Sequence, residues 1–403
     1  MQQLRRSRYI YIAVEDTSEV DIESLLRGEV RIVAATQFFA STPASGEKAK
    51  LSLAELELLS GVSSQSWTPA AELATRSADG VDLQSLLQRG LLVVSGEGEL
   101  KPGPAQARDQ SLEANQWHPS AALFHFMERQ EESDRSLEAP IDVAAMADAA
   151  ESDATQFVQR HGPPPPAFHQ RESTGERIEL PLEEKTGALY DTLRERKTTR
   201  RFDTGRELSL RDLSSLLRYV FGCHGIAPLD EDVTLLHKTS PSGGSLHPIE
   251  AYPLVLNAES LAPGLYHYRA DDHALEMLEP IPLEQAKKLA VDCCNAQLYA
   301  GDAHVLVILT ARFFRNQWKY RNRARTHGVM LMDAGHLSQT FYLVATDLGL
   351  GAFYTGAING PLIEERLGLV ASEEGAIGIC GCGVTTDRHG LGLKFQPFIP
   401  RET

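Results

Sequence analysis

The sequence predicts an α+β fold preceded by a smaller N-terminal module, and three observations lead to this prediction. From about residue 175, segments with helical spacing alternate with strand-like segments. Two of these strands, His304–Thr310 and Ala376–Val384, are continuous apolar runs, which is typical of strands buried on both faces. The start of the chain instead combines short helical segments with a following strand. We therefore expect a module over residues 1–100, a linker and helical segment over 101–175 and a main domain over 176–403.

The helices and strands expected in the N-terminal module follow the order of a winged helix, in which three short helices precede a strand. Strands are expected at Arg8–Val14, Val30–Ala34 and Leu91–Val94, and helices at Leu51–Ser60, Pro69–Arg76 and Leu83–Arg89. The third helix ends on Arg89, its one basic residue, whereas a helix that reads DNA normally offers several. This favours contact with a peptide or protein, or a purely structural role, over DNA binding.

A polar stretch follows at residues 100–115, where Pro102 and Pro104 indicate a linker. Trp117–Arg129 has the spacing of an amphipathic helix, and the GPPPP run at Gly162–Pro166 predicts a stiff polyproline spacer.

In the main domain, helical spacing and strand patterns alternate. The expected helices are Leu182–Lys197, Leu210–Tyr219 with Ser209 as its cap, Leu283–Cys293 and Thr326–Leu348. Ala251–Asn257 is a predicted strand, and Gly264–Arg269 with Ala274–Leu278 predicts a hairpin.

Composition excludes several function classes. The 403 residues carry 39 basic and 55 acidic side chains, a net charge of −16, which argues against a general nucleic-acid binder. Five scattered cysteines without a CxxC pair argue against a disulfide framework or a zinc site and favour a reducing cytoplasm. No apolar run is long enough to span a membrane, so we expect a cytoplasmic protein that does not contact a membrane. We also expect no bound metal.

Two stretches have the chemistry of a ligand site. RKTTRRF, from Arg196 to Phe202, places four basic residues and two hydroxyls at the end of a predicted helix, a set of donors that suits a phosphate. Taken alone, the stretch is better explained as a solvated basic helix end, which also suits the helix dipole. SPSGGSLHP, from Ser240 to Pro248, has two adjacent glycines that let a backbone approach a flat ligand closely, although an ordinary turn would look the same.

Together with the later GLYHY sequence, these stretches resemble the flavin-dependent nitroreductase fold. More narrowly, RKTTRRF, SPSGGSLHPIEAY and GLYHYRADDHALEML resemble the SagB-type dehydrogenases, which oxidise azolines to azoles in ribosomally made peptides. The resemblance covers about residues 117–400. It implies bound FMN and a homodimer around two flavins.

The resemblance also implies roles for individual residues. The FMN phosphate and ribityl chain would be held by Arg196, Lys197, Thr198 and Arg200, and the ring would lie against Pro241, Ser242, Gly243 and Gly244, a loop that the family's partner subunit contributes. Arg388 would close the phosphate site, although Thr386 stands where the family has a second basic residue. Gly356, with Thr355 beside it, would offer a backbone N–H to flavin N5, and Gln339, near His336 on the long helix, would lie near the flavin or the dimer interface. His336 could equally be a core histidine.

The basic sequence WKYRNRAR, from Trp318 to Arg325, contains the adjacent Lys319 and Tyr320. The azole-forming dehydrogenases carry a Lys–Tyr pair in this region, and the resemblance implies that the pair is catalytic. A phenol is a weak base at neutral pH, and a nearby cation favours its phenolate form. An exposed basic loop without catalytic function is the alternative.

The expected function is FMN-dependent dehydrogenation of a modified precursor peptide, azoline to thiazole or oxazole, with oxygen as the electron acceptor and a cyclodehydratase as a possible partner. The absence of a GxGxxG dinucleotide motif after a predicted strand favours oxygen over a nicotinamide. Two alternatives stay open: an NAD(P)H-dependent nitro- or quinone reductase on the same fold, and a non-catalytic peptide-binding scaffold with a decayed flavin site.

Overall fold

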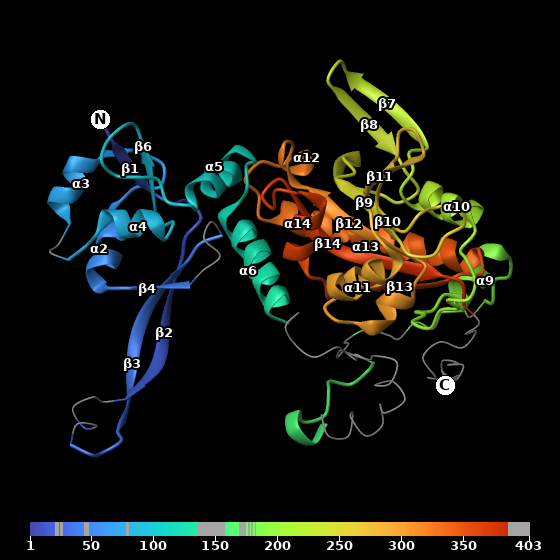
Figure 1. The fold of residues 1–403 in the computed structure, drawn as a ribbon, viewed down its shortest axis with the longest axis horizontal. Helices are drawn as coiled ribbons and strands as arrows, with labels where there is room; N and C mark the ends of the chain where they lie inside the picture. Colours follow the sequence, from blue (N-terminus) through green and yellow to red (C-terminus); the bar gives the residue numbers. More distant parts are fainter. Residues whose placement is uncertain are drawn as a thin grey trace. The chain divides into compact units, whose positions relative to one another are not determined.

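A computed structural model describes residues 1–20, 27–43, 48–77, 80–135, 158–168 and 183–385, together with positions 24, 175, 178, 180 and 181. The chain forms two compact units (Figure 1). The first comprises Met1–Arg135, Ala311–Leu331 and Gly360–Gly375, and the second comprises Ser136–Thr310, Met332–Asn359 and Ala376–Thr403.

The first unit contains a small antiparallel sheet with the order β5-β1-β6, and three helices between its strands. The elements are β1 (Gln3–Arg6), α2 (Leu53–Gly61), β5 (Thr68–Pro69), α3 (Ala70–Arg76), α4 (Leu83–Gln88) and β6 (Leu92–Ser95). A capping box between Ser52 and Glu55 begins α2, and the Asp82 carboxylate begins α4. The three predicted helices are confirmed. The winged-helix description stays a prediction, and the sequence did not indicate the central strand β1.

A second sheet of this unit, with the order β2-β3-β4, is a long ribbon made of β2 (Tyr11–Val20), β3 (Ile32–Ser41) and β4 (Lys48–Leu51) (Figure 1). The strands predicted at Arg8–Val14 and Val30–Ala34 therefore begin later and run further than expected. Both strands continue through polar residues, which their apolar pattern did not include. The ribbon is exposed to solvent along much of its length, so polar side chains are tolerated there.

The polar stretch 100–115 is not a plain linker, because it contains α5 (Gln106–Ala114), which precedes α6 (Pro119–Arg135). The buried Asp109 carboxylate of α5 accepts hydrogen bonds from Arg5 Nη2 (3.1 Å) and Ser7 Oγ (2.5 Å). A helix held by a buried ion pair shows few apolar residues, so its hydrophobic pattern is weak.

The second unit is built around a six-stranded sheet with the order β11-β10-β9-β12-β14-β13. Its strands are β9 (Ile249–Val255), β10 (Gly264–Arg269), β11 (Ala274–Pro280), β12 (Val305–Arg312), β13 (Gly351–Thr355) and β14 (Glu374–Gly383). The helices of residues 183–385 are α9 (Ala188–Glu195), α10 (Leu210–Val220), α11 (Leu283–Cys293), α12 (Phe313–Gln317), α13 (Arg325–Asp347) and α14 (Gly360–Leu367). Of these, α12 and α14 belong to the first unit, and the residues of α13 are divided between the two units at Leu331.

The apolar runs predicted as buried strands are confirmed, since β12 is buried along its length except at Arg312. The Ser209 side chain accepts a hydrogen bond from the N–H of Asp212, as the expected cap of α10 requires. Helix α9 is shorter than predicted because Gly187 before it has a φ of 116°, outside the helical region. The sequence did not indicate the hairpin of β7 (Gly225–Asp230) and β8 (Val233–His237), which projects from the sheet (Figure 1).

Within the described residues, none of the helices combines the length and hydrophobicity that a membrane crossing requires.

Candidate functional site

Three cations gather directly after helix α9. Arg196 ends this helix, and Lys197 and Arg200 follow in irregular backbone, all of them half-buried. Within the described part of the chain, no carboxylate lies at ion-pair distance from any of the three. The Nε atom of Arg200 is buried and has no hydrogen-bond partner there. In a chain with a net charge of −16, cations without a described acidic partner and an unpartnered buried donor are typical of a site that binds an anion.

Tyr342 of helix α13 holds the first half of this cation cluster in place. Its hydroxyl pairs with Thr198 Oγ1 at 3.1 Å and accepts a hydrogen bond from the N–H of Tyr354 at 2.9 Å. The Arg196 guanidinium carbon lies 5.4 Å from the centroid of the Tyr342 ring, a cation–π distance. The sequence did not indicate Tyr342, because a tyrosine within an apolar helix gives no signal of its own.

Arg200 is supported by a second tyrosine, and this contact connects the cations to the end of strand β13. The guanidinium carbon of Arg200 lies 5.4 Å from the ring centroid of Tyr299, whose hydroxyl donates to Gln297 Oε1. Burial raises the pKa of Tyr299, so this hydroxyl keeps its proton. Gln297 Nε2 in turn donates to Thr355 Oγ1 at 3.3 Å.

The turn after β13 is fixed at Thr355 and open at Gly356. The buried Thr355 hydroxyl accepts a hydrogen bond from the N–H of Ala357 at 3.1 Å. Gly356 is exposed, and a Cβ placed on it would meet nothing within 4 Å. The backbone at Gly356 is therefore accessible to an incoming group.

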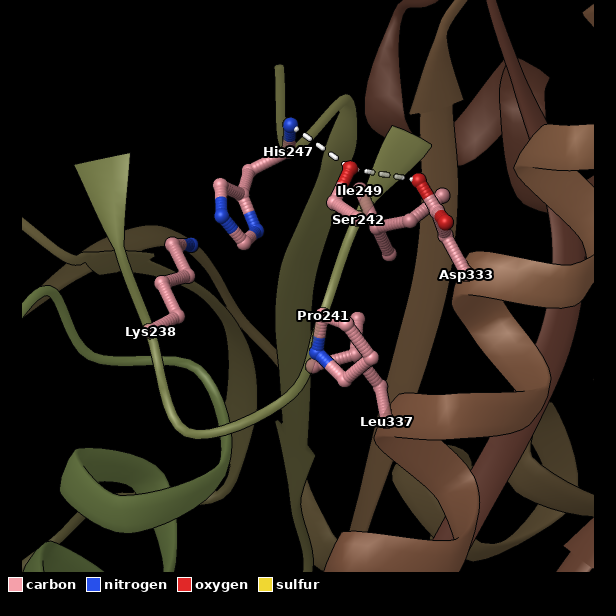
Figure 2. Close-up of a pocket in the computed structure, with 7 residues that line it drawn as sticks. All are labelled: Lys238, Pro241, Ser242, His247, Ile249, Asp333 and Leu337. Atoms are coloured by element: carbon pink, nitrogen blue, oxygen red, sulfur yellow. Dashed lines mark hydrogen bonds between the residues drawn. The ribbon is translucent and has the colours of Figure 1, made fainter. Parts of the chain in front are cut away.

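The SPSGG loop is anchored to helix α13 by Asp333 (Figure 2). The Ser242 hydroxyl donates to Asp333 Oδ2 at 2.6 Å, and the N–H of Gly243 donates to Asp333 Oδ1 at 3.2 Å. The Ser242 oxygen also accepts a hydrogen bond from the N–H of His247 at 3.0 Å. Burial raises the pKa of Asp333, while the bonds from Ser242 and Gly243 oppose that rise. Asp333 was not among the residues predicted from the sequence, although an acid within the apolar face of a predicted helix is a usable signal.

The hollow between this loop and helix α13 is small (Figure 2). Its free volume is about 10 Å³, which is room for about one water molecule. It is lined by Lys238, Pro241, Ser242, His247, Ile249, Asp333 and Leu337. The hollow is too small for a flavin ring.

The remaining predicted ligand residues differ in their placement. Pro241, Ser242, Gly243 and Gly244 form one continuous loop, in which Gly244 has a φ of 70°. Gln339 and His336 are both exposed on α13, so the alternative of a core histidine at 336 is wrong. Arg388 lies outside the described residues.

Lys319 and Tyr320 belong to the first unit, whereas the cation cluster and the SPSGG loop belong to the second. The Lys319 ammonium lies 5.6 Å from the centroid of the Tyr320 ring. The backbone N–H groups of both residues donate to the carbonyl of Asn316 in α12, and Thr326 Oγ1 donates to the carbonyl of Tyr320. The pair is thus held at a defined place, with Lys319 exposed and Tyr320 half-buried.

Two buried histidines of the first unit, His125 and His327, pack edge-on against each other, and both contact the ring of Trp117. The rings of His125 and His327 are 5.3 Å apart, and both nitrogens of His327 are buried without a hydrogen-bond partner among the described residues. His125 thus packs in the core of this unit. Burial lowers the pKa of His327 from 6.5 to about 4 and also lowers that of His125, where the field of His327 adds to the effect.

These histidines make the protein sensitive to acid. The unfolded chain binds a proton near pH 6.5, whereas the folded chain binds it only near pH 4, so acid favours unfolding. We expect the free energy of unfolding to fall by about 3 kcal/mol as the pH drops from 7 to 4. Urea denaturation at several pH values measures this fall. His327→Phe should flatten it and the exposed His336→Gln should not, and an equal slope in both variants would contradict this account.

The sequence of the chain is similar to those of proteins of a known family. The model of the nitroreductase family matches residues 193–384. MJ1384 of Methanocaldococcus jannaschii, whose name places it among the nitroreductases, is 31% identical over 190 residues, which cover 47% of this chain and 88% of that protein. The chain therefore belongs to the nitroreductase family and has its α+β oxidoreductase fold.

Two further relatives process peptides. The trifolitoxin-processing protein TfxB of Rhizobium leguminosarum is 29% identical over 40% of this chain, and the microcin B17-processing protein McbC of Escherichia coli is 28% identical over 36% of it. The matches span 44% of TfxB and 50% of McbC, about half the length of each. Among solved structures, the E. coli microcin synthetase McbBCD complex with truncated pro-MccB17 matches 61% of this chain and 95% of its own, with 21% identity and a TM-score of 0.41. The sequence matches to TfxB and McbC confirm the resemblance to peptide-maturation proteins.

Proposed function

We propose that the chain is an FMN-dependent dehydrogenase that oxidises a ribosomally made, modified peptide, converting azolines to thiazoles or oxazoles. The observation that carries the proposal is the cation cluster of Arg196, Lys197 and Arg200, which no described carboxylate neutralises. The relatives TfxB and McbC, named for peptide processing, support the substrate class.

The residues of the second unit suit FMN. Arg196, Lys197, Arg200 and the Thr198 hydroxyl offer the donors that a phosphate monoester requires. The loop Pro241–Gly244 presents a small, rigid surface for a flat ring. The accessible N–H of Gly356 offers a donor to this ring. Gln339 is exposed on α13 and is proposed as a further flavin contact. Bound FMN would supply a two-electron acceptor.

The reaction removes two hydrogens from the azoline ring, one as a proton and one as a hydride. With oxygen as final acceptor, azoline and O₂ give azole and hydrogen peroxide, so that atoms and electrons balance. In this proposal Tyr320 takes the proton from ring carbon, and the ammonium of Lys319 stabilises the phenolate that accepts it.

An NAD(P)H-dependent nitro- or quinone reductase is the second candidate, because MJ1384 carries a nitroreductase name and matches over 88% of its length. Anaerobic stopped-flow mixing separates the two. A thiazoline-containing peptide should bleach the flavin absorbance, whereas NADPH should bleach it slowly or not at all. Rapid bleaching by NADPH alone would favour the reductase.

A scaffold with a decayed flavin site is disfavoured by the intact cation cluster and by the support of both loops from α13. A colourless preparation that does not take up added FMN would restore this alternative.

The proposal includes partners. A precursor peptide is the substrate, a cyclodehydratase that forms the azolines is the expected companion enzyme, and a homodimer is expected from the resemblance stated above. The N-terminal module would hold the precursor by strand addition to its sheet.

In the sheet β5-β1-β6, the outer edge of strand β6 is occupied by the side chain of Gln106. Gln106 of α5 donates to the carbonyl of Val94 and accepts from its N–H, both at 2.9 Å, which fills the outer edge of β6 as another strand would. The opposite edge, β5, has two residues, and Pro69 lacks an N–H. A peptide that adds to β6 must therefore displace Gln106.

Gln106→Ala should consequently tighten precursor binding by about thirtyfold, since two competing amide hydrogen bonds of about 1 kcal/mol each are removed. Fluorescence anisotropy of a labelled precursor peptide measures the Kd. Gln84→Ala is the control, because Gln84 makes the same pair of bonds to the backbone of Lys101 away from this edge. Unchanged or weaker binding by Gln106→Ala would place the peptide elsewhere.

A further inference from the structure

We infer that Asp333 is a positioning residue, whose carboxylate fixes the Ser242–Gly243 segment in the shape that receives the flavin ring. The inference rests on the proposed FMN function and adds a residue to it. Asp333 lies on helix α13, ninety residues from the loop in sequence, and its side chain is directed at the loop (Figure 2).

The contact uses both oxygens of the carboxylate. Asp333 Oδ2 accepts from the Ser242 hydroxyl at 2.6 Å, and Oδ1 accepts from the Gly243 N–H at 3.2 Å. The residue is 3% exposed, so water competes little for either oxygen. A charged acceptor in such surroundings binds its donors more strongly than a neutral one.

The hydrogen-bond directions explain why a carboxylate is needed. The backbone N–H of Gly243 can only donate, and the Ser242 oxygen already accepts from the N–H of His247 at 3.0 Å, which directs its own proton toward Asp333. An amide at position 333 could accept one of these two bonds, but it would direct its NH₂ at the other donor.

The backbone that follows Gly243 adopts a conformation of high energy at two residues. Ser245 and His247 have φ values of 55° and 46°, in the left-handed region that residues other than glycine seldom occupy. Such a loop keeps its shape only when neighbouring contacts enforce it. Asp333 supplies two of these contacts, and Thr340 of the same helix supplies a third through its 2.7 Å hydrogen bond with Ser240.

The test compares Asp333→Asn with Asp347→Asn in the full chain. Asp347 is an exposed acid at the end of the same helix, outside the machinery described above. FMN titration followed by flavin fluorescence gives the Kd, and the visible spectrum at saturating FMN reports the ring environment. We expect Asp333→Asn to raise the Kd at least about tenfold and to move the bound spectrum toward that of free FMN. Asp347→Asn should match the wild type in both.

Hydrogen exchange gives a readout that needs no FMN. Amides of residues 240–247 should exchange faster in Asp333→Asn than in Asp347→Asn, while the strands of the sheet keep their protection. Ser242→Ala is the second variant, in case Asp333→Asn does not fold. Its effect on the Kd should be of the same direction, and the double variant should be little worse than the stronger single one, because both lose the same contact.

The outcomes separate the inference from the proposed function. A wild-type chain that does not bind FMN overturns the proposed function and, with it, the role inferred for Asp333. A wild-type chain that binds FMN, with Asp333→Asn equal to it in Kd, spectrum and exchange at 240–247, overturns the inference and leaves the function standing.

Discussion

Replacing Tyr320 by phenylalanine should slow flavin reduction by an azoline peptide about 10²–10⁴-fold, the usual consequence of losing a positioned base. The phenylalanine keeps the ring that packs beside Lys319, and FMN and peptide binding should be unchanged. Anaerobic stopped-flow mixing measures the step without reoxidation by oxygen.

Lys319→Ala should slow the same step by a similar factor, and the double variant should be little slower than either single one, since the pair acts as a unit. Arg321→Ala is the matched control, because Arg321 is an exposed cation of the same loop whose Nε donates to the carbonyl of Trp318. If Tyr320→Phe reduces its flavin at the wild-type rate, the base lies elsewhere and the loop has an electrostatic role only.

Arg200→Ala should lose FMN while the protein stays folded. The Nε of Arg200, buried without a hydrogen-bond partner among the described residues, is the strongest single sign of an anion site, and two charge-assisted hydrogen bonds to a phosphate are worth about 3 kcal/mol or more. The Kd for FMN should therefore rise at least about a hundredfold. Equilibrium dialysis measures this Kd, and circular dichroism checks the fold.

Arg194→Ala serves as the control for that experiment. Arg194 lies in the last turn of α9, exposed, and its guanidinium pairs with Asp191 of the same helix. Its replacement removes a cation from the same region without removing a ligand of the expected phosphate. Equal FMN affinities of the Arg200 and Arg194 variants would contradict the phosphate assignment.

The sequence predicted the elements whose own pattern is strong. Continuous apolar runs such as β12 can only be buried, and the capped helix α10 carries its start signal in Ser209. Helix α5 was missed because its buried face includes Asp109, whose partner Arg5 lies more than a hundred residues away in the chain. No local pattern reports such a pair.

The same distinction applies to the site. Eight of the twelve residues predicted to bind FMN occur in two compact sequence stretches, 196–200 and 241–244, so motif and chemistry together indicate them. Asp333 and Tyr342, which hold these stretches in place, are single residues on a long helix, and their role follows only from hydrogen bonds across the fold. Residues that support a site through tertiary contacts are thus the ones that sequence reasoning leaves out.

The most direct test of the central claim is the mass of the product. Purified protein with FMN is incubated in air with a synthetic peptide that contains one thiazoline ring, without NADPH, and the peptide is analysed by mass spectrometry. The account predicts the loss of two hydrogens, the appearance of thiazole absorbance and one hydrogen peroxide per ring. An unchanged peptide mass with FMN fully bound, together with rapid NADPH oxidation in the presence of a quinone, would contradict it.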